Sequence, residues 1–222
     1  MNKVMISPSI LSADFGHLRA SVEALDRCNA DRIHIDIMDG HFVPGITFGA
    51  KMVAALRSAT KIPFEAHLMV SDPGIQAKAV VAAGADIVIV HHEACADLEG
   101  EIAAIESQGA KAGVAINPQT TFDSISSNMG SIDTLMIMGV DPGMGGQKFM
   151  PVVLDKIRQA RAYVDKNRYG TIIAVDGGIN IETGRLAMEA GASELVAGSA
   201  IFGAHASVSD SIEGFRKLCW NH

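Results

Sequence analysis

The stretch Ile33-His34-Ile35-Asp36-Ile37-Met38-Asp39-Gly40 decides how this chain folds. Isoleucine alternates with other side chains over its first six residues, which is typical of a β-strand that sends neighbouring residues to opposite faces. His34, Asp36 and Met38 therefore share one face. Burying an imidazole and a carboxylate together costs several kcal/mol unless a partner compensates, and a divalent metal ion is the simplest partner. The stretch predicts a polar site on a buried strand.

The composition is that of one globular domain spanning 1–222, because 222 residues with 48% hydrophobic side chains can bury a continuous core. A formal net charge of −7 and an isoelectric point near 5.6 argue against nucleic acid or a membrane surface as a partner. No signal sequence and no membrane-spanning apolar run is visible. Cys28, Cys95 and Cys219 are odd in number and widely spaced, which indicates a reducing cytoplasm.

Short β-type segments alternate with helical segments along the whole chain. The predicted strands span 4–10, 33–38, 63–70, 87–90, 112–117, 134–140, 171–176 and 194–197. The predicted helices span 14–29, 50–59, 73–83, 98–108, 121–128, 152–166, 181–190 and 209–219. This order predicts an α/β fold, a single (β/α)₈ TIM barrel. A doubly wound open sheet is the alternative, but no G-x-G-x-x-G motif follows the first strand and polar residues gather at most strand ends.

Four inward polar positions on the second, third and seventh strands are His34, Asp36, His67 and Asp176. Taken alone, a strand histidine is more often a hydrogen-bonded core residue, and an Asp before Gly-Gly is most often a turn residue. Together at one end of a barrel, two His and two Asp form a plausible ligand set for one divalent metal ion, Zn²⁺, Fe²⁺, Mn²⁺ or Co²⁺. His91, after the fourth strand, can touch such a site without being a ligand.

The two carboxylates of this set also suggest a reaction. Strands two and seven face each other across a barrel, so Asp36 and Asp176 can approach one small ligand from opposite sides. One carboxylate can remove a proton next to a carbonyl and the other can return one to the opposite face, with a metal ion as Lewis acid. This inverts the carbon centre. Asp39 is the rival carboxylate, but strand alternation turns it away, and we interpret it as a loop residue.

Met38, Met69 and Met138 follow the same alternation as the polar residues and are expected to line the site. Methionine is usually core filler, but at a barrel mouth its uncharged side chain would also exclude water from an electron-rich intermediate. The two interpretations carry equal weight. Ser9, which ends the first strand, can hydrogen-bond a substrate oxygen or simply form a turn.

Glycine clusters follow the last three strands. They are Gly143-Met144-Gly145-Gly146, Gly177-Gly178 and Gly198-Ser199. Any single cluster is most simply a tight turn, whereas clusters at adjacent strand ends let backbone N–H groups converge on an anion. Phosphate binding by the last loops is common in barrels. Apart from Lys148 the clusters hold no cationic side chain, so recognition would depend on backbone amides.

These residues resemble the ribulose-phosphate 3-epimerase family along the whole chain. The resemblance is carried by Ser7-Pro8-Ser9-Ile10-Leu11-Ser12-Ala13-Asp14-Phe15, by the stretch from His34 to Pro44, by His67-Leu68-Met69-Val70, by Pro142-Gly143 with Gly145-Gly146-Gln147, by Val175-Asp176-Gly177-Gly178, and by Ala197-Gly198-Ser199-Ala200-Ile201-Phe202.

The resemblance implies a metal-dependent (β/α)₈ epimerase that interconverts D-ribulose 5-phosphate and D-xylulose 5-phosphate. The family's metal ligands match His34, Asp36, His67 and Asp176, and its proton acceptor and donor match Asp36 and Asp176. The family's substrate contacts match Ser9, His67, Gly143, Met144, Gly145, Gly146, Asp176, Gly177, Gly178, Gly198 and Ser199. Family members are often dimers or hexamers, so a homo-oligomer is expected.

Some alternatives remain open. Gly139 and Met144 depart from the family pattern, which leaves a relative acting on a longer ketose phosphate such as D-allulose 6-phosphate. A phosphosugar lyase, decarboxylase or synthase would want a lysine at the active face, and no lysine is expected inside strands two to eight. A non-catalytic phosphate-binding barrel would be expected to lack Asp36 or Asp176, and both are present.

Overall fold

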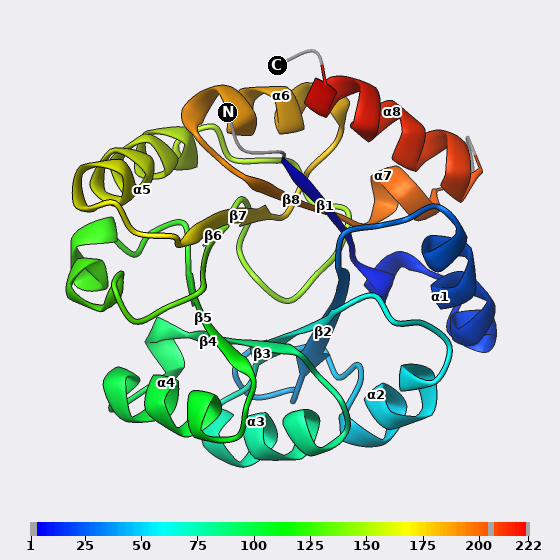
Figure 1. Cartoon of the computed structure of the whole chain (residues 1–222), viewed down its shortest axis with the longest axis horizontal. Helices are drawn as coiled ribbons and strands as arrows, with labels where there is room; N and C mark the ends of the chain where they lie inside the picture. Colours follow the sequence, from blue (N-terminus) through cyan, green and yellow to red (C-terminus); the bar gives the residue numbers. More distant parts are fainter. Residues whose placement is uncertain (1–3, 204–206, 221–222) are drawn as a thin grey trace.

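The computed structural model describes residues 4–203 and 207–220, and the prediction of a (β/α)₈ barrel is confirmed (Figure 1). The strands are β1 (Met5–Pro8), β2 (Ile33–Met38), β3 (Phe64–Met69), β4 (Ile87–His91), β5 (Lys111–Ile116), β6 (Thr134–Met138), β7 (Ile172–Asp176) and β8 (Glu194–Ala197). They pair in parallel in the order β1-β8-β7-β6-β5-β4-β3-β2. A parallel bridge between Ser9 and His34 joins β1 to β2 and closes the ring.

The helices surround the barrel, as Figure 1 shows. They are α1 (Leu18–Arg27), α2 (Ala50–Arg57), α3 (Pro73–Ala82), α4 (Leu98–Ser107), α5 (Val153–Asn167), α6 (Ile181–Ala190), the short α7 (Ser199–Phe202) and α8 (Val208–Trp220). Parallel strands require such crossovers, and the helices bury the outer face of the sheet. Within residues 4–203 and 207–220, no helix combines the length and the apolar character needed to cross a membrane.

The structure corrects three expectations. The helix expected over 121–128 is two 3₁₀ turns, Phe122–Ser124 and Ser126–Asn128, so the β5–β6 connection has no α-helix. The helix expected to start at residue 14 begins at Leu18, after a 3₁₀ turn over Phe15–His17. Lys111 lies inside β5, contrary to the expectation that strands two to eight hold no lysine. It is the exposed first residue of that strand, so it lies at the end opposite the active face.

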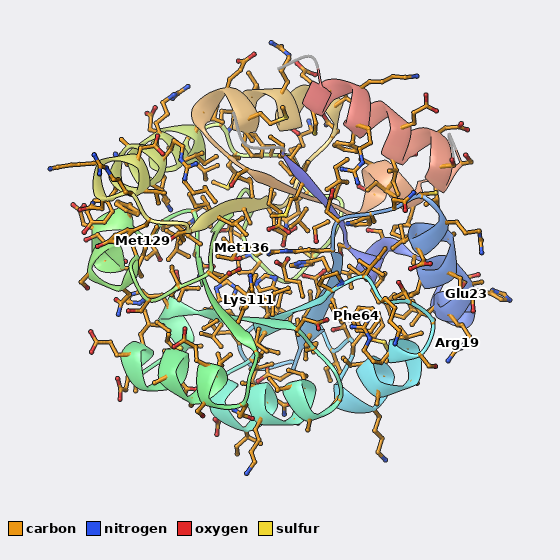
Figure 2. The ribbon with its side chains drawn as sticks, viewed as in Figure 1. Arg19, Glu23, Phe64, Lys111, Met129 and Met136 are labelled. Atoms are coloured by element: carbon orange, nitrogen blue, oxygen red, sulfur yellow. The ribbon has the colours of Figure 1, made fainter. Side chains whose placement is uncertain are left out.

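Alternation along the strands separates two apolar regions. Outward residues such as Ile35 and Phe64 pack against the helices, and the guanidinium of Arg57 on α2 lies 3.8 Å from the centre of the Phe64 ring. Inward residues such as Ile89, Met136 and Val196 form a separate buried cluster inside the barrel. Figure 2 labels Phe64 and Met136 in these two regions. The inner cluster leaves room for polar residues towards β2 and β3.

Hydrogen bonds anchor the loop between β7 and α6 at the carboxyl end of the barrel. The Asn180 carboxamide oxygen accepts from the backbone N–H groups of Glu182 and Thr183, and the Asn180 N–H donates to the Thr183 hydroxyl at 2.9 Å. This reciprocal cap begins α6. The same hydroxyl donates to the carbonyl of Gly178 at 2.8 Å. The chain segment that follows Asp176 is therefore fixed by the helix it leads into.

Candidate active site

The four polar side chains predicted from the sequence meet inside the barrel. One potential ligand atom from each of His34, Asp36, His67 and Asp176 lies within 4.8 Å of the others. Asp36 and His67 are register neighbours on β2 and β3, and Asp176 on β7 pairs with Met138 on β6. The Asp176 carboxylate lies 3.9 Å from His34 Nε2 and 3.7 Å from His67 Nδ1. Two opposite walls of the barrel thus contribute to one cluster.

Glu65 orients His34 within this cluster. Its Oε1 lies 2.7 Å from His34 Nδ1, and its Oε2 accepts from Arg32 Nη1 at 2.6 Å. An ionised carboxylate only accepts, so His34 carries a proton on Nδ1. His34 Nε2 then faces Asp36 Oδ1 at 3.3 Å and His67 Nδ1 at 3.3 Å. A carboxylate behind a histidine in this way fixes the ring for metal binding.

The two aspartates hold protons with different strengths. Burial opposes ionisation of Asp36, but His34 and His67 outweigh that effect and lower its pKa well below the ordinary value. Burial and repulsion from Asp36 raise the pKa of Asp176 to about 7. The Ser9 hydroxyl also donates to Asp36 at 2.5 Å. Near neutral pH the pair therefore combines an ionised carboxylate with one that holds a proton readily.

The donor set fits a divalent cation. Two imidazole nitrogens and two carboxylates converge from buried or half-buried positions, and nitrogen and oxygen ligands of this kind suit Zn²⁺ as well as Fe²⁺, Mn²⁺ or Co²⁺. His34 Nε2 and His67 Nδ1 are the ring nitrogens that face the carboxylates. A cation here would offset the repulsion between Asp36 and Asp176. The cluster can therefore hold a metal ion.

A cavity at the carboxyl ends of the strands lies over the cluster. Its walls include nearly every residue predicted to bind substrate or to line the site: Ser9, Asp36, Met38, Met69, Met138, Gly143, Met144, Gly145, Gly146, Asp176, Gly177, Gly178, Gly198 and Ser199. His34 and His67 are fully buried and are not among the lining residues. The predicted substrate contact of His67 therefore involves the floor beneath the cavity and stays a prediction.

Gly139 and Met144, which depart from the family pattern, differ in their position relative to the cavity. Met144 lines the cavity and is 70% exposed, so it can influence the space around a substrate. Gly139 is absent from the lining, and a Cβ there would lie 2.5 Å from the carbonyl oxygen of Gly177. Its glycine is explained by this close backbone approach between β6 and β7. The sequence had suggested that Gly139 shapes the cavity. The structure shows that it does not line the cavity.

Met38, Met69 and Met138 both fill the core and line the cavity. Met38 and Met69 pack with Val43 in a small buried cluster, and Met138 belongs to the apolar cluster inside the barrel. All three also line the cavity. Their side chains therefore fill the interior and present an apolar wall beside Asp36 and Asp176.

Asp39 is a loop carboxylate, as predicted. It accepts from the backbone N–H groups of His41, Phe42 and Ser71 and from the Ser71 hydroxyl. These hydrogen bonds outweigh burial and lower the pKa of Asp39 well below its usual range. The carboxylate thus ties the loop after β2 to the loop after β3 and does not belong to the cluster of His34, Asp36, His67 and Asp176.

Backbone conformation explains the glycines after β7. Gly177 and Gly178 have φ of +108° and +67°, which disfavours other residues. A Cβ on Gly178 would also lie 2.4 Å from the backbone nitrogen of Phe149. The turn interpretation is therefore sufficient for this pair. Its role in binding phosphate, with Gly143–Gly146 and with Gly198 and Ser199, stays a prediction.

A buried charge cluster beneath the site was not predicted. Arg32, only 5% exposed, donates through Nη1 to Glu65 at 2.6 Å, to Glu194 at 2.9 Å and to the Thr134 hydroxyl at 3.1 Å. Burial and repulsion from Glu65 raise the pKa of Glu194 to about 8 despite Arg32. The sequence pattern hinted at this charge cluster only through Glu65, which shares its strand face with His67. The partners of Arg32 lie too far along the chain for any local pattern.

We expect Glu194 to make the stability of the metal-free protein depend on pH. Its pKa rises from an ordinary 4.5 to about 8, so the folded state binds an extra proton between these values. The stabilisation is complete below pH 4.5 and is lost as pH rises through 8. Urea unfolding at pH 5 to 8 should show the wild type losing on the order of a few kcal/mol relative to Glu194→Gln. If the difference in unfolding free energy between the wild type and Glu194→Gln stays the same from pH 5 to 8, the raised pKa of Glu194 is contradicted.

Comparisons with known proteins agree with the geometry. A family model described as the ribulose-phosphate 3 epimerase family matches residues 5–202. The chain is 47% identical over 201 residues to the ribulose-phosphate 3-epimerase of Bacillus subtilis, covering 90% of this chain and 93% of that protein. It is 42% identical over 215 residues to the enzyme of that name from Synechocystis, covering 96% and 93%.

Solved structures show the same fold. The 3-keto-L-gulonate-6-phosphate decarboxylase of Vibrio cholerae matches with a TM-score of 0.70 and 18% identity, covering 99% of each chain. This likeness shows the barrel alone, whereas the family match and the close relatives confirm the resemblance drawn from the sequence. The chain belongs to the ribulose-phosphate 3-epimerase family, and it is therefore an isomerase.

Proposed function

We propose that this protein inverts carbon 3 of D-ribulose 5-phosphate to give D-xylulose 5-phosphate, and catalyses the reverse reaction. The observation that carries the proposal is the pair of carboxylates, Asp36 and Asp176, which reach one cavity from β2 and β7. Relatives 42% and 47% identical to this chain carry the name of this activity.

In the proposed mechanism, Asp36 removes the proton from carbon 3 of D-ribulose 5-phosphate. Its lowered pKa keeps it ionised, and the Ser9 hydroxyl holds its orientation. Asp176, whose pKa is raised to about 7, returns a proton to the opposite face of the enediolate. A divalent ion held by His34, Asp36, His67 and Asp176 would supply Lewis acidity for the negative charge that develops on the sugar oxygens. The reverse reaction exchanges the roles of the two aspartates.

The rest of the cavity wall suits a phosphorylated sugar. Backbone N–H groups of Gly143–Gly146, of Gly177 and Gly178, and of Gly198 and Ser199 are the proposed phosphate and sugar contacts. The apolar wall of Met38, Met69 and Met138 would exclude water from the reacting carbon, which strengthens electrostatic stabilisation of the enediolate.

The alternative functions are less well supported than the pentulose epimerase. A D-allulose 6-phosphate epimerase would use the same carboxylates, but the relatives' names favour the pentulose, and Gly139 lies outside the cavity wall. A lyase or decarboxylase that needs a lysine is disfavoured because the described residues lining the cavity include none. Lys111 is 61% exposed in its side chain and pairs with Asp133 at 2.7 Å. A non-catalytic phosphate binder does not explain the paired carboxylates.

The proposed partners are a small ketose phosphate and further copies of this chain, without nucleic acid or membrane. The proposed compartment is the cytoplasm. Cys28, Cys95 and Cys219 are all free thiols in the described part of the chain, which is consistent with a reducing environment.

A coupled assay tests the function. The Zn²⁺-, Mn²⁺-, Fe²⁺- or Co²⁺-loaded protein should convert D-ribulose 5-phosphate much faster than D-allulose 6-phosphate. Chelation should abolish turnover, and re-addition of metal should restore it. A preference for the hexulose phosphate would keep the mechanism and change the substrate. Full activity after exhaustive chelation, with no metal by elemental analysis, would contradict the metal-dependent mechanism.

A further inference from the structure

The ring nitrogen of His67 that points away from the cluster has a specific partner. His67 Nε2 lies 2.9 Å from His91 Nε2, and the two rings stack with centres 5.0 Å apart. Both side chains are fully buried. His91 is the last residue of β4, next to β3 in the sheet. Nitrogen atoms this close must share one proton, because two N–H groups cannot face each other at hydrogen-bond distance.

Glu93 determines which nitrogen carries that proton. Its Oε2 lies 3.2 Å from His91 Nδ1, and its Oε1 accepts from the Asn117 N–H at 2.8 Å and from the Thr120 hydroxyl. Hydrogen bonds from His91, from the Thr120 hydroxyl and from the Asn117 N–H outweigh burial and lower the pKa of Glu93 to about 2, so it is an ionised acceptor. His91 must therefore donate from Nδ1. With Nδ1 directed at Glu93, Nε2 is the nitrogen of His91 left to accept from His67.

The tautomer of His91 determines the tautomer of His67. If His91 Nε2 accepts, then His67 Nε2 carries the proton and donates to it. The lone pair of His67 then sits on Nδ1, which lies 3.2 Å from Asp36 Oδ1 and 3.7 Å from Asp176 Oδ2. With the opposite arrangement, a proton on Nδ1 would occupy the direction in which His67 can bind a metal. Glu93 thus fixes the tautomer of His91, and His91 in turn fixes the tautomer of His67.

We propose that His91 and Glu93 are positioning residues that hold His67 in the tautomer able to bind the metal ion through Nδ1. They do for His67 what Glu65 does for His34. The proposal rests on the metal site of the proposed function and extends it to two residues outside the ligand set. Removing a partner of this kind weakens metal binding by about 10–100-fold in other metal sites.

The test measures Zn²⁺ affinity by competition with a chromogenic chelator. His91→Phe keeps the ring and its stacking but removes the acceptor, so Zn²⁺ should bind about 10–100-fold more weakly. His91→Gln retains an acceptor oxygen and should recover most of this loss. His92→Phe is the matched control, because His92 is the adjacent half-buried histidine and its Nδ1 has no partner among the described residues. It should bind Zn²⁺ like the wild type.

A second readout needs no metal. Nitrogen-15 NMR of the metal-free wild type should show His67 protonated at Nε2 and His91 at Nδ1, and Glu93→Gln should populate the other tautomer of His67. Protonation of His67 at Nδ1 in the wild type would overturn the proposal, as would wild-type Zn²⁺ affinity in folded His91→Phe. A wild-type chain that binds no Zn²⁺ would overturn the metal site itself and the positioning role with it, an outcome visible before any variant is made.

Discussion

Asp176→Asn should lower kcat for epimerisation of D-ribulose 5-phosphate by about 10²–10⁴-fold, the contribution expected of a lost acid–base group. The asparagine amide has nearly the same shape as the carboxylate, but it can neither deliver nor accept the proton on its face of the sugar. Asp36, from β2, remains intact on the other side of the cavity. The coupled assay with purified variant and wild type at equal metal content measures the loss.

Deuterium exchange separates this mechanism from simple loss of binding. In D₂O, Asp176→Asn should still exchange the carbon-3 hydrogen of D-ribulose 5-phosphate through Asp36 without forming the epimer. Asp36→Asn should show the mirror result and exchange D-xylulose 5-phosphate only. Because both residues belong to the proposed metal site, each variant is compared after elemental analysis of its metal. Inversion by Asp176→Asn within tenfold of the wild type, with metal bound, would show that another group supplies the second proton.

The cluster itself could be predicted because its pattern is local. Alternation over Ile33–Met38 fixes which residues face inward, and the order of strands in a barrel places His67 beside them and Asp176 across the interior. What the pattern cannot give is the partner of each ring nitrogen. His91 is visible as a strand-end residue, but its contact with His67 depends on a side-chain rotation that no spacing encodes.

Long-range and backbone features were also beyond the sequence pattern. Arg32 contacts Thr134 and Glu194, which lie 102 and 162 residues further along the chain. Gly139 looked like a residue of the substrate cavity, whereas its role is a close approach to Gly177. The 3₁₀ turns over 122–128 replace an expected helix, since propensity in so short a segment is readily overridden by tertiary packing.

Arg32→Met should lower the free energy of unfolding by about 3–5 kcal/mol, the range expected when one member of a buried ion pair is removed. Methionine fills similar space without charge, so the ionised Glu65 would stay buried without a cation, whereas Glu194, whose pKa is about 8, already holds a proton at pH 7. Both carboxyl groups are fully buried, which prevents water from compensating. Urea denaturation followed by circular dichroism at pH 7 measures the difference.

Lys111→Met is the matched control because both cations contact Asp133, Lys111 at 2.7 Å and Arg32 at 3.5 Å. The Lys111 side chain is 61% exposed, so removing its ion pair should cost less than about 1 kcal/mol. The double variant Arg32→Met with Glu194→Gln should recover little of the loss at pH 7, because Glu194, whose pKa is about 8, already holds a proton there and the charge left without a cation is that of Glu65. A cost for Arg32→Met no larger than that of Lys111→Met would contradict this account. Glu65 would then hold His34 in place without help from the guanidinium, and the support of the metal site would end at Glu65.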